Sequence, residues 1–146
     1  MTDQCTITAL FNYPVKSCRG TQVDSVSISP TGIEGDRQLM IIKDGKFVNQ
    51  KRLPKLATVS TLRIDESKIE FDNDERDALI HEINAEGEES IIDFYTNLVP
   101  VIDQGDTLAN WVSAVIDNDI RVVALKSTFT RTVPLTNLHW LMGLIS

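Results

Sequence analysis

The chain turns at Tyr13-Pro14-Val15-Lys16-Ser17-Cys18-Arg19-Gly20, directly after an alternating apolar segment at residues 5–13. Pro14 ends that segment because it has no backbone N–H to donate to a sheet, and the closing glycine frees the backbone. The turn is therefore expected to be firmly anchored. Lys16 contributes a point charge and Ser17 a short hydroxyl donor, a combination suited to phosphate or another oxyanion.

Short alternating segments separated by turn residues continue along the chain, which is typical of an all-β barrel or sandwich. Asp44-Gly45 between two apolar runs is the strongest hairpin signal. Pro100 predicts an edge position or a bulge for its strand. The expected strands are 5–13, 23–28, 37–42, one starting at 47, 57–64, 68–71, 78–83, 90–94, 97–102 and 120–125.

One helix is expected near residues 105–116. Leu108, Trp111, Val112 and Val115 recur at helical spacing, so a single apolar stripe can cover one end of a barrel. Residues 105–107 offer a cap, and Asn118 is expected to stop the helix. Trp111 is accordingly expected in the core.

With 146 residues the chain is large enough for one domain with its own core. The first residues lack a positive n-region, and no apolar run approaches the roughly 20 residues that span a bilayer. We expect a cytoplasmic protein without a membrane partner. Cys5 and Cys18 are expected to be free thiols, with Cys18 a small packed residue.

The net charge of −7 argues against a nucleic-acid binder, but the charges are unevenly distributed along the chain. Residues 1–64 hold nine Lys or Arg against five Asp or Glu, whereas residues 65–146 hold five against sixteen. No basic run is interleaved with the aromatic residues that a nucleic-acid stacking surface needs. Together with the Lys16 turn, this uneven distribution favours a local anion site.

Two interpretations of the basic residues are open from the residues alone. Lys16 and Arg37 can bind an anion, with Arg37 adding a bidentate fork. Alternatively, Lys16 and Arg19 are solvated, and Arg37 pairs with Asp36 or with the nearby glutamate. His81, a lone histidine in an alternating segment, is expected to be structural, and no zinc, P-loop or dinucleotide pattern is present.

The sequence resembles the amino-terminal β-barrel domain of MOSC proteins, the molybdenum-cofactor-binding family that includes the bacterial YcbX proteins and the mitochondrial amidoxime-reducing component. The resemblance covers roughly residues 6–136. It rests on the opening motif at 11–20, the segment Gly32-Ile33-Glu34-Gly35-Asp36-Arg37-Gln38-Leu39-Met40, and the helix and strand at 103–113 and 120–123. It implies a mainly β, MOSC amino-terminal type barrel with one main helix.

This resemblance implies that Lys16, Ser17 and Arg37 contact the molybdopterin part of the cofactor. The family commonly has an arginine where Lys51 aligns, so either Lys51 replaces it or Arg52 does after a slip of one residue. No catalytic or metal-ligating residue is expected in this chain, because the family's molybdenum-ligating cysteine belongs to a carboxy-terminal domain.

We expect residues 1–136 to form the barrel domain and residues 137–146 an apolar tail. The alternative for the tail is an ordinary terminal element packed on the barrel. Read from the third base of the His139 codon, the tail permits Leu-Ala-Asp-Gly, which is close to the family's next segment. The tail is thus interpreted as a frameshift remnant of a longer ancestor.

The leading functional expectation is a domain that supplies part of a molybdopterin site and is not catalytic alone. Intact relatives resemble molybdenum-dependent reductases of N-hydroxylated compounds or carriers of cofactor sulfur. Two alternatives stay open. The chain is a non-catalytic interaction module that self-associates through its apolar tail, or a separate MOSC-domain subunit completes the reductase site in trans.

Overall fold

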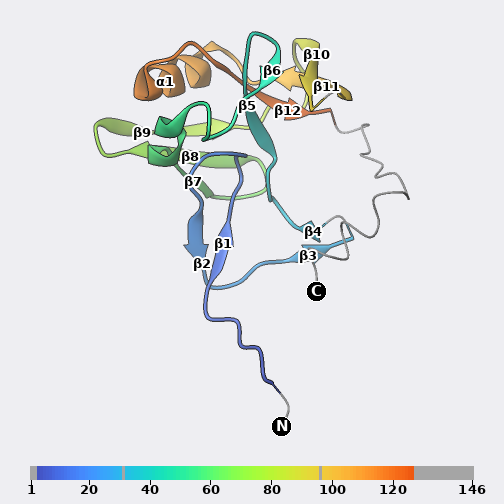
Figure 1. Ribbon diagram of the computed structural model, residues 1–146, viewed down its shortest axis with the longest axis vertical. Coiled ribbons are helices and arrows are strands. Elements are labelled where there is room, and N and C mark those ends of the chain that lie inside the picture. The colour runs from blue at the N-terminus through green and yellow to red at the C-terminus, as the bar shows by residue number, and fades with distance from the viewer. Residues whose placement is uncertain (1–2, 31, 96, 127–146) are drawn as a thin grey trace.

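The computed structural model describes residues 3–30, 32–95 and 97–126, and its main element is a closed five-stranded β-barrel (Figure 1). Neighbouring strands follow the order β10-β11-β12-β5-β6, and the barrel closes through a parallel bridge between β6 and β10. This confirms the mainly β barrel that the sequence predicts. The strands are β5 (Leu39–Lys43), β6 (Lys46–Phe47), β10 (Glu89–Phe94), β11 (Asn97–Asp103) and β12 (Arg121–Leu125).

A second, three-stranded sheet lies beside the barrel and packs against the helix (Figure 1). It is formed by β7 (Ser60–Arg63), β8 (Lys68–Asn73) and β9 (Arg76–Glu82). Two small hairpins extend away from this body: β1 (Leu10–Asn12) with β2 (Thr21–Val23), and β3 (Ile28–Ser29) with β4 (Gly32–Ile33). The helices are the 3₁₀ helix η1 (Pro54–Thr58) and α1 (Asp106–Ile116).

The described part of the chain forms two apolar cores. The smaller one fills the barrel and takes residues from all five strands: Met40, Ile42, Phe47, Ile92, Val99, Val101 and Val123, with Phe94 packed against them. The larger core lies between the barrel, the three-stranded sheet and α1. Trp111 belongs to this larger core as expected, and its indole N–H donates to the Asp77 carbonyl at 2.9 Å.

The helix lies where its periodicity predicts, but its ends differ in detail. Gly105 is the N-cap and no side chain caps the first turn; Asp106 instead pairs with Arg121. The helix ends at Asp117, which adopts a left-handed φ of 52° and donates its N–H to the Ser113 carbonyl. Asn118 is therefore one residue beyond the stop, although its N–H also bonds Ser113.

Strand boundaries near the amino terminus were less well predicted. The first strand is only β1, because β2 supplies a ladder partner for three residues, and Ile7 is exposed. The expected strand at 23–28 is divided between β2 and β3. By contrast, Asp44 and Gly45 form the predicted hairpin turn, both with positive φ, as a type I′ turn requires.

Pro100 does not place β11 at an edge, because β11 pairs with both β10 and β12. Its pairing with β12 starts at Val101, so no residue of β12 needs a donor from Pro100. The Pro100 carbonyl still accepts the Lys126 N–H at 3.1 Å. The proline is tolerated because its missing N–H faces the point where β12 ends.

No helix among the described residues is long and apolar enough to cross a bilayer. The expected tail at 137–146 and the last part of the expected domain, residues 127–136, lie outside the described residues.

Candidate anion-binding site

The turn at residues 13–20 is hydrogen-bonded to the barrel through β5. The backbone N–H of Lys16 donates to the Leu39 carbonyl at 2.8 Å, and the Leu39 N–H donates to the Pro14 carbonyl at 3.1 Å. These two bonds form a parallel bridge between Val15 and Leu39. The backbone of Lys16 is thus held in a fixed position next to the barrel.

The other end of the same turn is bonded to the three-stranded sheet. Arg19 donates its N–H to the Val59 carbonyl at 2.8 Å and accepts both the N–H and the hydroxyl of Thr61 at 2.9 Å. The turn therefore joins the barrel to the sheet, and the expectation of firm anchoring is confirmed. Cys18 between the two ends is 2% exposed and packs in the larger core, as expected.

Lys16 is half-buried and lies over two aromatic rings. Its Nζ is 5.5 Å from the centre of the Phe47 ring and 5.9 Å from that of Phe94. The two rings are 5.0 Å apart, and Tyr95 extends the group. Because an aromatic face attracts a cation, this aromatic floor holds the ammonium at the barrel. No local sequence pattern predicts this aromatic floor, since Phe47 and Phe94 are far apart in the chain.

Ser17 has a left-handed φ of 76° and is half-buried. Its carbonyl accepts a 2.9 Å hydrogen bond from the Gln50 side chain. Gln50 directly precedes Lys51 and Arg52, the two residues of which either can take the place of the family's arginine. Sequence reasoning considered the two cations there and missed the amide that touches the turn.

Arg37 is also left-handed, with a φ of 48°. Its N–H donates to the Tyr13 carbonyl at 2.6 Å, and its guanidinium carbon lies 5.2 Å from the centre of the Tyr13 ring. It pairs with Asp36 at 2.5 Å, as the simpler interpretation of its role expects, while Glu34 pairs with Arg63 instead. With its side chain 51% exposed, Arg37 can still reach a ligand.

The structure brings the three residues onto one backbone assembly, in which the turn and the segment leading into β5 are hydrogen-bonded side by side. Their side chains do not converge on one shared contact. Lys16 lies over Phe47 and Phe94, whereas Arg37 lies over Tyr13. A ligand bound by both would have to extend between the two aromatic positions.

Left-handed backbone at non-glycine residues points to the same place. Among the described residues, five that are not glycine have positive φ. Asp44 and Tyr95 lie in hairpin turns, Asp117 ends the helix, and Ser17 is the third residue of the β-turn that the Cys18 N–H closes on the Val15 carbonyl, so turns and the helix end explain these four. The fifth is Arg37, in the turn between β4 and β5. Such strain costs about 1–2 kcal/mol per residue and gathers at functional sites.

Two buried acceptors beside the site have no hydrogen-bond partner among the described residues: Asn12 Oδ1 and Gln38 Oε1. Asn12 directly precedes Tyr13, and Gln38 directly follows Arg37. A buried polar atom without a partner is costly, so both oxygens are unusual features of the segments next to the turn.

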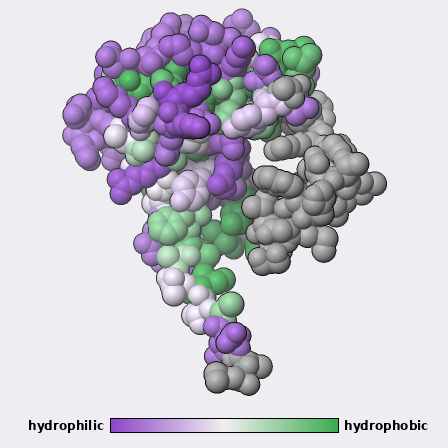
Figure 2. All heavy atoms as spheres, in the orientation of Figure 1, coloured by the Kyte–Doolittle hydropathy of each residue, from purple (hydrophilic) through white to green (hydrophobic). Residues whose placement is uncertain are grey.

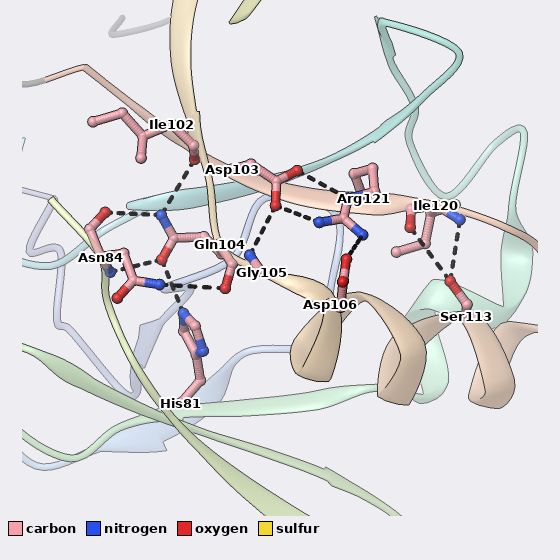
Figure 3. Close-up of polar contacts among 10 residues, drawn as sticks. All are labelled: His81, Asn84, Ile102, Asp103, Gln104, Gly105, Asp106, Ser113, Ile120 and Arg121. Atoms are coloured by element: carbon pink, nitrogen blue, oxygen red, sulfur yellow. Dashed lines mark hydrogen bonds and ion pairs between the residues drawn. The ribbon is translucent and has the colours of Figure 1, made fainter. Parts of the chain in front are cut away.

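A separate polar network supports β11 and α1 (Figure 3). Arg121 donates to both carboxylate oxygens of Asp103 and to Asp106. The Arg121 hydrogen bond is the main reason that the pKa of Asp103 is lowered. Since the carboxylates are occupied by Arg121, this network is structural.

His81 belongs to the neighbouring part of this network (Figure 3). Gln104, 2% exposed, accepts the Asn84 N–H at 2.8 Å through Oε1, and the same oxygen lies 2.9 Å from His81 Nε2. Its amide nitrogen donates to the Asn84 carbonyl, which fixes the orientation of the amide. His81 Nε2 therefore carries a proton, in a role consistent with the structural one expected.

Among residues 3–30, 32–95 and 97–126, no three His, Cys, Asp or Glu side chains are grouped to hold a metal. Burial raises the pKa of the Cys18 thiol to about 12, so this cysteine stays protonated.

The family model described as the MOSC N-terminal beta barrel domain matches residues 4–119. A Bordetella bronchiseptica protein of known solution structure has a similar fold, with a TM-score of 0.64 and 18% identity, covering 88% of this chain and 95% of that one.

Curated relatives are much longer than this chain. The molybdenum cofactor sulfurase of Danio rerio is 27% identical over 136 residues, which are 87% of this chain and 16% of that protein. Mitochondrial amidoxime reducing component 2 of Bos taurus is 35% identical over 69 residues, 44% of this chain and 20% of that protein. The chain thus corresponds to one part of these relatives.

Proposed function

The chain belongs to the MOSC N-terminal β-barrel domain family, and from this premise we propose that its Lys16 turn supplies part of a molybdopterin site. Lys16 and Arg37 would hold the phosphate and the polar edge of the pterin by charge, and the Ser17 hydroxyl would donate a hydrogen bond to the ligand. Similarity to a molybdenum cofactor sulfurase and to an amidoxime reducing component supports this ligand class.

The observation that carries the proposal is the hydrogen-bonded pairing of the Lys16 turn with the segment that leads into β5, which places Lys16, Ser17 and Arg37 on one backbone assembly. The left-handed conformations of Ser17 and Arg37 are held by hydrogen bonds from distant parts of the chain. A folded protein keeps such conformations where the surroundings impose them, which is typical of ligand-binding positions.

The residues present fit the ligand chemically. A pterin ring offers N–H donors that match the unpaired acceptors of Asn12 and Gln38, and a phosphate accepts from Lys16 and Arg37. When bound, the molybdenum cofactor supplies the redox or sulfur-transfer chemistry, and the protein binds and orients it. The contribution of this chain is binding, and it is not catalytic alone.

Titration of purified molybdopterin against the full chain tests this function. Lys16→Ala and Arg37→Ala should each weaken binding at least about tenfold, since each removes a charge-assisted contact. Lys55→Ala, a cation of η1 away from the turn, is the matched control and should change affinity less than about twofold. Unchanged affinity in both site variants would reject the molybdopterin site.

A second candidate is an interaction surface on the two extended hairpins and the segment that precedes β1. Ile7, Phe11 and Ile28 are 78%, 47% and 82% exposed, and Figure 2 shows hydrophobic atoms along this part of the molecule. Exposed apolar patches mark contact surfaces. We propose that a separate MOSC-domain subunit docks on this surface and completes the site.

Co-purification with such a subunit tests the second candidate. Ile28→Lys should abolish the complex. Ile80→Lys makes the same substitution at an exposed position of β9 and should retain the complex. Sedimentation at several concentrations separates this result from self-association. A complex that survives Ile28→Lys, or a chain that forms only homodimers, would contradict docking on the hairpins.

A further inference from the structure

A basic hollow lies beside the β5–β6 hairpin, apart from the Lys16 turn. Its volume is about 370 Å³, and it is lined by Lys43, Asp44, Lys46, Val48, Arg52 and Leu53. This size is within the range of small-molecule sites. Three cations against one carboxylate make the hollow positive, although the chain as a whole has a net charge of −7.

The three cations that line this hollow form no ion pair with Asp44, its acidic lining residue, and Asp93 faces Lys46 across the β6–β10 bridge. Among the described residues, neither Lys43, Lys46 nor Arg52 forms an ion pair with a carboxylate. Lys43 Nζ donates to the Asn118 side chain, which positions the ammonium without cancelling its charge. Asp44, the acidic lining residue, is exposed in the hairpin turn.

The strand register brings two of these cations together. Lys43 and Lys46 are direct partners across the β5–β6 hairpin. Like charges placed opposite each other on neighbouring strands destabilise a sheet. Arg52, from the loop before η1, adds a third positive charge to the same space. A bound anion would offset this repulsion.

The hollow and the Lys16 turn lie on opposite faces of β6. Phe47 points into the barrel core, where Lys16 lies over its ring. Its chain neighbours Lys46 and Val48 point the other way, since successive side chains of an extended strand alternate, and Val48 packs in the larger core. The hollow is therefore distinct from the proposed molybdopterin contacts.

We propose that the basic hollow is a second anion site, which binds a small multiply charged ligand of the phosphate class. Arg52 supplies a planar fork suited to phosphate oxygens, and Lys43 and Lys46 supply point charges. This assigns Arg52, rather than Lys51, a binding role, because Arg52 lines the hollow and Lys51 does not. The ligand differs from the pterin of the Lys16 turn.

The test is titration of the full chain with inorganic pyrophosphate, followed by ¹H–¹⁵N NMR and calorimetry at constant ionic strength. Saturable shifts are expected at residues 43–53, with no such shifts for sodium chloride. Arg52→Gln and Lys43→Gln should weaken pyrophosphate at least about tenfold, because each loses a charge-assisted contact. Arg52→Lys should lie between Arg52→Gln and the wild type.

Two control variants locate the site. Lys55→Gln makes the same charge change close by in the chain and should alter affinity less than about twofold. Lys16→Ala should leave pyrophosphate binding at the hollow intact. Shifts confined to residues 13–20, loss of binding in Lys16→Ala alone, or equal weakening by Lys55→Gln would each overturn the proposal, as would absence of saturation. Unfolding curves of every variant show that each is folded.

Discussion

Arg37 and Tyr13 are joined twice: the Arg37 N–H donates to the Tyr13 carbonyl at 2.6 Å, and the Arg37 guanidinium carbon lies 5.2 Å from the centre of the Tyr13 ring. The backbone bond holds Arg37 in its left-handed conformation, and the ring limits where the guanidinium can lie. The same residue thus stores backbone strain and presents a charge at the surface.

Replacing Arg37 separates these two roles. Arg37→Gly and Arg37→Ala both remove the guanidinium, but only glycine accepts a positive φ without steric cost. We expect Arg37→Gly to be more stable than Arg37→Ala by about 0.5–1 kcal/mol in urea unfolding, with the greater freedom of unfolded glycine already included. Both variants should lose anion binding equally. An alanine variant as stable as the glycine variant would show that this position is not strained.

Gly20 is required for a different reason, close approach of the backbone. A Cβ there would lie 2.5 Å from the Asn12 carbonyl oxygen and 2.6 Å from the Tyr13 ring. Gly20→Ala should therefore destabilise the protein by about 2 kcal/mol or more, in the upper range of overpacking. Gly87→Ala is the matched control, because its Cβ would make only ordinary contacts at 3.5 Å.

Gly87→Ala should change stability by less than about 1 kcal/mol, and in the stabilising direction, since alanine restricts the unfolded chain. Guanidinium unfolding of the two variants checks the contrast. Equal effects at both positions would contradict the crowding at Gly20.

The sequence predicted those features that depend on local pattern. The Asp44-Gly45 turn, the helix at 105–116 and the core position of Trp111 follow from turn chemistry and periodicity. The predicted edge position of Pro100 was wrong. Whether a strand tolerates a proline depends on where the neighbouring strand ends, and strand register is not a local property. The predicted length of the first strand was wrong for the same reason.

The candidate site was predictable only as a set of residue types. The sequence is enough to select Lys16, Ser17 and Arg37 as side chains that can donate hydrogen bonds to an anion. The aromatic floor under Lys16, however, comes from β6 and β10. The Gln50 contact and the positive φ of Ser17 also depend on tertiary pairing. These features need the barrel to close, which no local pattern reports.

The two cysteines should differ sharply in reactivity. Cys5 is exposed, whereas Cys18 is buried and burial raises its pKa to about 12. The thiolate is the reacting form, so only Cys5 should react rapidly with a thiol reagent such as dithionitrobenzoate at pH 8. One equivalent is expected in the native protein and two in urea. Cys5→Ser should abolish the rapid phase; a rapid phase that persists in this variant would contradict the burial of Cys18.

Acid unfolding should report on the Arg121 and Asp103 pair. Arg121 lowers the pKa of Asp103 below its ordinary value of 3.8. A carboxyl group with a lowered folded pKa stabilises the protein above its unfolded pKa, and this contribution is lost as the pH falls through the folded pKa. Stability should thus decline below about pH 4, where unfolded aspartates begin to take up protons.

Arg121→Gln should remove much of that dependence. At pH 7 it should cost about 1–2 kcal/mol, less than a buried pair would, because solvent screens the partly exposed arginine. Between pH 4 and pH 2 its stability should fall less steeply than that of the wild type, as measured by urea unfolding at each pH. Asp106→Asn removes only the exposed contact, with 85% of that side chain accessible, and should keep the wild-type slope. Parallel wild-type and Arg121→Gln profiles would mean that another carboxylate governs acid stability.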